Sequence, residues 1–117
     1  ADNCNGSYLR IWNNKIDGSD NALKFNYDIS SFLDNSWHHF VISVGQNGNS
    51  TLYIDGMEKA SNSDDQIYGV NGLGCLIGKY CYVSSSYPAF NGKLDNFRIY
   101  NYPLTLAQVQ QIFNAKQ

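Results

Sequence analysis

The sequence predicts an all-β fold, an antiparallel β-sandwich or jelly roll, that ends in one short C-terminal helix. Short stretches in which apolar and polar residues alternate recur along the 117 residues, and such alternation is typical of strands with one buried face. Glycine-containing turn sequences such as Asp55-Gly56 separate these stretches and indicate hairpins. Helical spacing of apolar residues is found after Pro103. The length predicts a single domain, residues 1–117.

Two strands are predicted near the N-terminus, at residues 7–13 and 22–27. In the first of them Leu9 and Ile11 share one face, as the two-residue period of a strand requires. The intervening residues 13–21 are rich in Asn, Asp and Gly, which favour turns. We therefore expect them to form the loop of a hairpin that pairs the two strands.

The most apolar strand is predicted at residues 37–44, and a hairpin follows it. Its two arms are residues 51–56 and 57–61, joined at Asp55-Gly56. This dipeptide tolerates the positive φ angles that tight hairpin turns require.

The two histidines, His38 and His39, are neighbours in the predicted strand, so their side chains point to opposite faces. They therefore cannot bind one metal ion together, and the cysteine spacing does not match a zinc ribbon. The sequence places no nucleophile beside either ring. A hydrogen-bonded structural role is the expectation for both.

A second group of strands is predicted in the C-terminal half, a short one at residues 74–79 and a long one at residues 90–104. The apolar alternation of the long strand slips by one residue at Asp95-Asn96, which is the effect of a β-bulge. This strand is expected to close the sandwich and to lead directly into the helix.

The helix is predicted at residues 106–114, and its start has a clear signal. Thr105 and Gln108 have the spacing of a capping box. Leu104 and Val109 have the spacing of a hydrophobic staple. The residues expected to face the core are Leu106, Val109, Ile112 and Phe113.

Charge and hydropathy exclude several classes of partner. The formal net charge is −2 and the pI is near 5.4, which argues against nucleic acid and against an anionic membrane surface. No apolar run reaches the length of about 18 residues needed to span a bilayer. Membrane insertion is therefore not expected.

Three cysteines are present, so at least one of them has no partner within the chain. Two of the three could form a disulfide in a secreted protein. The alternative is that Cys75 is simply a small buried apolar residue. The disulfide candidates are Cys4, Cys75 and Cys81.

Several motifs occur in an order that resembles a known family. They are Trp37-His38-His39-Phe40-Val41, Leu52-Tyr53-Ile54-Asp55-Gly56, Leu76-Ile77-Gly78, and the run from Gly92 to Leu104 followed by the helix. Together they resemble the laminin G-like, concanavalin A-like jelly-roll domains over about residues 8–113. The resemblance implies an extracellular or cell-surface binding module. Members of that family usually carry further strands upstream of residues 7–13, so this chain is either an incomplete fragment or a minimal variant of the fold.

Three functions remain open on this basis. The first is a non-catalytic binding or adhesion module for a glycan or an extracellular protein. The second is a structural assembly subunit, an oligomer or a fragment completed by strands from a partner chain. The third is a remnant or accessory module of a glycoside hydrolase. Catalysis is not expected, because a hydrolase needs two carboxylates flanking the scissile bond. The chain has a single glutamate, Glu58, and its nine aspartates lie mostly in predicted loops and turns.

Candidate ligand-binding residues are aromatic side chains outside the expected core pattern, because rings stack on the apolar faces of sugars. The alternative is that they pack against loops. These candidates are Trp12, Tyr80, Tyr82 and Tyr87.

The resemblance also implies a role for Asp95. In related sandwiches the corresponding acidic position helps to hold a structural calcium ion, and carboxylate and carbonyl oxygens are the ligands that calcium prefers. The alternative is that Asp95 accepts backbone N–H hydrogen bonds and needs no ion. Calcium is accordingly the one cofactor that the sequence suggests.

Overall fold

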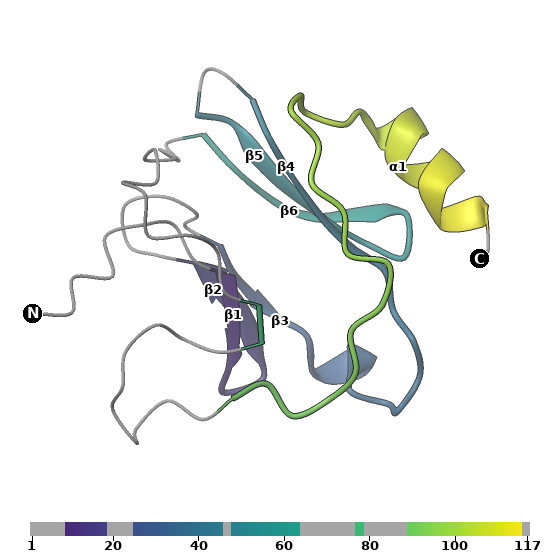
Figure 1. Ribbon diagram of the computed structural model, residues 1–117. Helices are drawn as coiled ribbons and strands as arrows, with labels where there is room; N and C mark the ends of the chain where they lie inside the picture. Colours follow the sequence, from purple (N-terminus) through teal and green to yellow (C-terminus); the bar gives the residue numbers. More distant parts are fainter. Residues whose placement is uncertain (1–8, 19–24, 46–47, 64–76, 79–88, 116–117) are drawn as a thin grey trace, which may run out of the picture.

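The computed structural model describes residues 9–18, 25–45, 48–63, 77–78 and 89–115 (Figure 1). Within these residues the chain forms two three-stranded antiparallel sheets and one short C-terminal α-helix. The predicted fold class, an antiparallel β-sandwich with one terminal helix, is confirmed. In the described part of the chain, no helix has the length and apolar character needed to cross a membrane.

The first sheet has the strand order β1-β2-β3. Its strands are β1 (Leu9–Trp12), β2 (Lys15–Gly18) and β3 (Asn26–Asp28). The prediction that residues 13–21 form a loop was wrong, because β2 lies within them and pairs with both neighbours. Asn13 and Asn14 have φ angles of 51° and 61°, which is the geometry of a two-residue type I′ hairpin turn. Asparagine tolerates this left-handed conformation, and so Asn-Asn acts here as a hairpin turn.

The second sheet has the strand order β4-β5-β6. Its strands are β4 (Phe40–Val44), β5 (Ser50–Ile54) and β6 (Met57–Asn62), so the three strands predicted here are confirmed with shifted ends. The Asp55-Gly56 turn is also confirmed, with φ angles of 52° and 79°. The register between β5 and β6 shifts between Leu52 and Tyr53. This irregularity decides which side chains face one another at the far end of the hairpin.

The β4–β6 sheet is the middle layer of the molecule, because it buries side chains on both faces. One face packs against the β1–β3 sheet, through Ile16, Phe25, Ile29, Leu52 and Ile54. The opposite face packs against the C-terminal part, where Tyr53, Leu104 and Val109 are buried together. Full burial of one large aliphatic side chain stabilises a fold by about 1.5–3 kcal/mol, so these two clusters hold the three layers together.

The helix α1 (Leu106–Asn114) has the bounds predicted from the sequence. The Thr105 hydroxyl accepts the Gln108 backbone N–H at 3.2 Å, and the Gln108 side chain accepts the Thr105 N–H at 2.9 Å. The capping box is therefore confirmed. The buried stripe is narrower than predicted, because Val109 is buried whereas Leu106 and Phe113 remain partly exposed.

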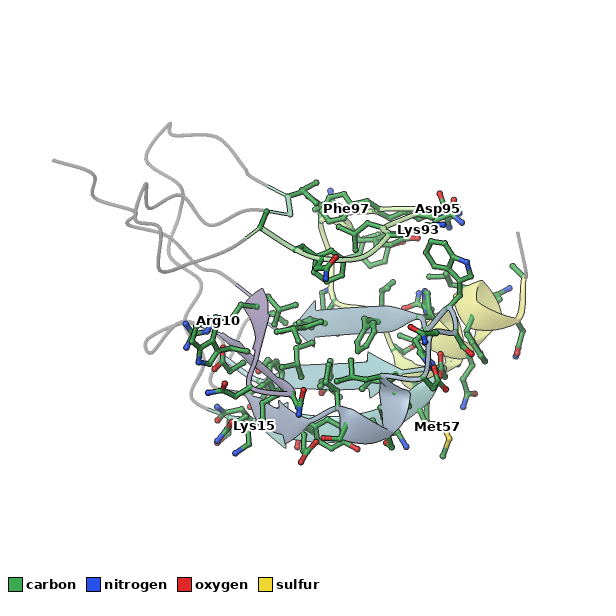
Figure 2. The ribbon with its side chains drawn as sticks, turned by 90° about the horizontal axis from the view of Figure 1, so that it is seen from below. Arg10, Lys15, Met57, Lys93, Asp95 and Phe97 are labelled. Carbon is green, nitrogen blue, oxygen red and sulfur yellow. The ribbon has the colours of Figure 1, made fainter. Side chains whose placement is uncertain are left out.

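The predicted long strand at residues 90–104 was wrong. The structure has no strand in this segment, which runs as an irregular connection past the sheets to the helix (Figure 1). Figure 2 shows Lys93, Asp95 and Phe97 on this connection, away from Arg10 and Lys15 of the first sheet. At the expected bulge, Asn96 has a φ angle of 53° and makes a turn. A strand needs a hydrogen-bonded neighbour, and an alternating sequence cannot supply one.

The predicted strand at residues 74–79 is described only at Ile77 and Gly78, and neither of them is in a strand. The Gly78 carbonyl accepts the Phe90 backbone N–H at 2.7 Å. This bond ties the start of the 90–104 segment to an earlier part of the chain. The remaining residues of the predicted strand lie outside the described ranges.

Candidate functional site

Trp12, the first predicted ligand-binding residue, is the last residue of β1 and is 40% exposed. The Arg10 guanidinium lies 5.6 Å from the centroid of its ring. Arg10 is in turn held by Asp17, with 2.7 Å between Nε and the carboxylate. One face of the indole is therefore shared with a cation, and a sugar stacking there would have to displace it.

The other aromatic candidates, Tyr80, Tyr82 and Tyr87, lie outside the described residues. Their role in ligand binding stays a prediction, as does that of Trp12. The disulfide candidates Cys4, Cys75 and Cys81 also lie outside the described ranges.

Asp95 is exposed on the connection between the sheets and the helix. One oxygen of its carboxylate accepts the backbone N–H of Asn96 at 2.8 Å. This bond is of the kind expected if Asp95 stabilises the local turn by itself. Within the ranges that the structure covers, no group of three or more acidic, histidine or cysteine side chains is placed to hold a metal ion. Calcium at Asp95 stays a prediction.

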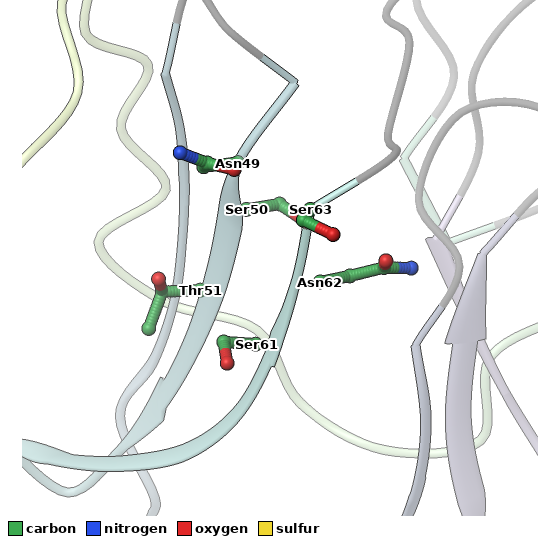
Figure 3. Close-up of a pocket in the computed structure, with 6 residues that line it drawn as sticks. All are labelled: Asn49, Ser50, Thr51, Ser61, Asn62 and Ser63. Carbon is green, nitrogen blue, oxygen red and sulfur yellow. The ribbon is translucent and has the colours of Figure 1, made fainter.

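An open hollow of about 340 Å³ lies at the end of the β5–β6 hairpin opposite its turn (Figure 3). We call it the hydroxyl–amide hollow, because each described residue that lines it carries a hydroxyl or a carboxamide. These residues are Asn49, Ser50, Thr51, Ser61, Asn62 and Ser63. Such groups donate and accept hydrogen bonds without carrying charge.

Strand pairing explains how the hollow forms. Ser50 pairs with Asn62, and Thr51 pairs with Ser61, so two polar runs far apart in the sequence meet at one end of the hairpin. Ser50 is fully buried at this end of the hairpin. The sequence contained a usable signal, since Asn49-Ser50-Thr51 and Ser61-Asn62-Ser63 both consist of amides and hydroxyls. Only the register shows that they face each other.

A second polar cluster is centred on His38. Its Nδ1 lies 2.7 Å from a carboxylate oxygen of Asp55, and its Nε2 lies 2.7 Å from one of Asp34. The hydrogen bond that His38 donates to the Asp34 carboxylate is the main cause of its raised pKa, and the bond that it donates to Asp55 acts in the same direction. The same contact lowers the pKa of Asp34. The expected hydrogen-bonded role is therefore confirmed for His38.

His39 faces the other side of the sheet. Its ring lies 5.9 Å from that of Phe113 on α1. Its Nδ1 is buried and has no hydrogen-bond partner among the described residues, which differs from the expectation. Burial lowers the pKa of His39, so the neutral ring is favoured.

Large apolar side chains are exposed beside the His38 cluster and along the connection to the helix. Trp37, which was predicted within a strand, lies before β4 and is 66% exposed. On the connection, Ile99 is 77% exposed. Tyr100 and Tyr102 pack edge to face with their ring centroids 5.7 Å apart. Sequence reasoning did not name these residues as ligand-binding candidates, because it assigned them to the predicted strands at residues 37–44 and 90–104.

Comparison with known proteins identifies a family that matches this chain. The family model described as "Concanavalin A-like lectin/glucanases superfamily" matches residues 4–110. Paraclostridial mosquitocidal protein 1 of Paraclostridium bifermentans is 31% identical over 91 residues, which cover 74% of this chain and 7% of that protein.

A solved structure with a similar fold is that of residues 221–444 of an S-layer domain-containing protein from Clostridium thermocellum. It matches 85% of this chain and 51% of that chain, with a TM-score of 0.58 and 22% sequence identity. The chain thus spans about half of that structure and a small part of the mosquitocidal protein.

Proposed function

Because the chain belongs to the concanavalin A-like lectin/glucanases superfamily, we propose that it is a non-catalytic extracellular module that binds a neutral glycan at the hydroxyl–amide hollow. The fold suits a carbohydrate- or protein-binding module. The observation that carries the choice of glycan is the lining of the hollow, in which each described side chain is uncharged and polar.

The chemistry of the hollow matches that of a sugar. Hydroxyl groups of a sugar both donate and accept hydrogen bonds, and serine, threonine and asparagine side chains do the same. A neutral ligand is favoured because no described lining residue carries a charge that could neutralise one on the ligand. A net gain of about 0.5–1.5 kcal/mol for each hydrogen bond makes weak binding the expected mode.

Two further considerations support a non-catalytic, extracellular module. Glycoside hydrolases need two carboxylates about 5–10 Å apart around the scissile bond, and the described lining of the hollow contains none. Asp34 and Asp55, which His38 holds between them, are both engaged by its imidazole. The two similar proteins, a mosquitocidal protein and an S-layer domain-containing protein, favour a location outside the cell.

The test is binding to an array of neutral and charged glycans, followed by calorimetric titration of the best ligand. We expect neutral glycans to bind, and the double substitution Asn49→Ala with Ser61→Ala to weaken binding about tenfold, as the loss of one to two hydrogen bonds predicts. Both side chains are exposed, so the fold should tolerate the change.

A matched control is Asn101→Ala with Ser31→Ala, which removes the same groups from exposed positions outside the hollow. This pair should bind as the parent chain does. Equal binding by the parent and the Asn49/Ser61 variant would exclude the hollow as the site. Absence of binding across the whole array would exclude a glycan ligand.

A second candidate function, assembly with another chain, is favoured by the exposed apolar side chains of the 90–104 connection. Leu94, Phe97 and Ile99 are all exposed there. Apolar side chains gathered on one segment are typical of a surface that another protein covers. Sedimentation velocity at increasing concentration should then show self-association that the substitution Ile99→Lys removes. A monomer at all concentrations would argue against self-assembly.

A further inference from the structure

The His38 ring connects two parts of the chain that are separate in sequence. Asp34 lies in the loop before β4, and Asp55 lies in the β5–β6 turn. The ring nitrogens lie 2.7 Å from one carboxylate oxygen of each. Without this imidazole between them, the two carboxylates would face each other as like charges.

The geometry requires a doubly protonated ring. Ionised carboxylates only accept hydrogen bonds, and a neutral imidazole has a single N–H to donate. Two contacts of 2.7 Å to two carboxylates therefore need both N–H groups of the imidazolium. Loss of one proton leaves a nitrogen lone pair facing a carboxylate, which is repulsive.

The carboxylate of Asp55, in the β5–β6 turn, is held in position by backbone hydrogen bonds. The other oxygen of Asp55 accepts the His39 N–H at 2.9 Å, and the Asp55 N–H donates to the His39 carbonyl at 2.9 Å. Apart from His38, the hydrogen bond given to the Asp34 carboxylate within the described residues comes from its own loop, where it accepts the Ser36 N–H at 3.0 Å. When one of the two contacts fails, the Asp34 side is the one free to move.

We propose that His38 is a pH-operated latch, which fastens the loop of residues 33–37 to the Asp55-Gly56 turn while its ring carries both protons and releases the loop when one is lost. The loop carries Leu33 and Trp37, both of which are exposed. Trp37 directly precedes His38, so its fluorescence can report on the state of this loop.

The charged groups around the His38 ring favour its protonated form in the folded chain. Asp34 and Asp55 favour the charged ring and together raise the pKa of His38, against the opposing effect of burial. The Phe32 ring packs edge-on against the imidazole at 5.3 Å, and the Lys59 ammonium lies over that phenyl ring at 5.7 Å. Arg98 acts on His39, on the other face of the sheet.

The direction of the pH response follows from the raised pKa of His38. The folded chain holds the His38 proton at pH values where the unfolded chain, with an ordinary pKa of 6.5, has lost it. The latch is thus closed at pH values below the raised pKa of His38. It opens as the pH rises through the raised pKa.

The experiment uses Trp12→Phe as the background, because the chain has two tryptophans and this change leaves Trp37 as the sole reporter. Acrylamide quenching of Trp37 is measured from pH 5 to pH 9, beside an NMR titration of the His38 ring. We expect His38 to titrate above 6.5, and quenching of Trp37 to increase with the same midpoint.

Two variants make the outcome decisive. Asp34→Asn, on an exposed loop side chain, should lower the midpoint of both curves, whereas His38→Gln should abolish the pH-dependent change in quenching. The control His39→Gln should leave the His38 midpoint above 6.5. Titration of His38 at or below 6.5, or a quenching curve that Asp34→Asn leaves unchanged, would overturn the latch. If His38→Gln does not fold, Asp34→Asn alone decides.

Discussion

Strand β5 and the connection at residues 90–104 have similar sequence patterns and opposite fates. Both place apolar residues two positions apart, Leu52 and Ile54 in β5 and Phe97 and Ile99 in the connection, and both were predicted as strands. In the structure β5 pairs with β4 and β6, and Leu52 is 0% exposed. The connection forms no strand, and its Ile99 is 77% exposed. Alternation thus encodes an apolar face, whereas a strand also needs neighbours that supply hydrogen bonds and a surface to cover that face.

The largest expected effect is the difference in stability between a substitution at Leu52 of β5 and one at Ile99 of the connection. Leu52→Ala should lower the free energy of unfolding by about 2–5 kcal/mol, because it leaves a cavity in the core. Ile99→Ala should change it by less than about 0.5 kcal/mol, as for other exposed positions. Urea denaturation followed by circular dichroism measures both. A large loss for Ile99→Ala would mean that the connection is packed in solution.

The next largest expected effect is the difference in stability between alanine substitutions at two glycines that have similar backbone conformations. Gly56 and Gly78 have φ angles of 79° and 83°, so alanine is strained at each, by about 1–2 kcal/mol. At Gly56 an added Cβ would also lie 3.0 Å from Phe113 Cδ2, whereas at Gly78 it would meet nothing within 4 Å. Gly56→Ala should therefore destabilise the fold more than Gly78→Ala in the same denaturation assay. Equal losses would mean that α1 does not press on the β5–β6 turn.

A smaller effect is expected at the start of α1. Thr105→Ala removes the hydroxyl that accepts the Gln108 N–H and should cost about 1 kcal/mol. Thr105→Ser keeps the hydroxyl and serves as the control. Thermal melts of the two variants should separate by a few degrees. Coincident melts would show that Leu104 and Val109 hold this end of the helix without the cap.

The smallest expected effect is on the pH dependence of the stability, to which His39 and His38 contribute with opposite signs. Burial lowers the pKa of His39, so the unfolded chain binds more protons than the folded chain below about pH 6.5, and stability is lost as the pH falls. His39→Gln should flatten the melting temperature between pH 5 and pH 6.5. His38→Gln should instead remove a contribution that is present at low pH and lost as the pH rises. An unchanged slope for His39→Gln would mean that water reaches its ring.

Features that depend on neighbouring residues could be predicted well. The helix at residues 106–114 and its Thr105 cap followed from a capping box, which acts within one turn. The Asp55-Gly56 turn followed from the tolerance of these residues for positive φ. The membership in the concanavalin A-like superfamily was also evident from the order of its motifs.

Features that depend on pairing could not be predicted in the same way. The strand β2 was hidden because its few residues, with Ile16 as the single apolar one, lie among turn-forming residues. The hydroxyl–amide hollow was missed because it requires the register shift near Leu52, which sets Thr51 opposite Ser61. The partners of His38 were missed because Asp34 and Asp55 approach it from two different segments.

The sequence by itself thus determined the fold class, the helix with its cap, the hairpin turn and the family. The tertiary structure alone decided which alternating segments became strands, which polar runs met in a hollow, and which carboxylates enclosed His38. The physical reason is the separation along the sequence between the groups that stabilise each feature. Caps and turns are stabilised by contacts within a few residues, whereas ladders, hollows and ion clusters need groups brought together by folding of the whole chain.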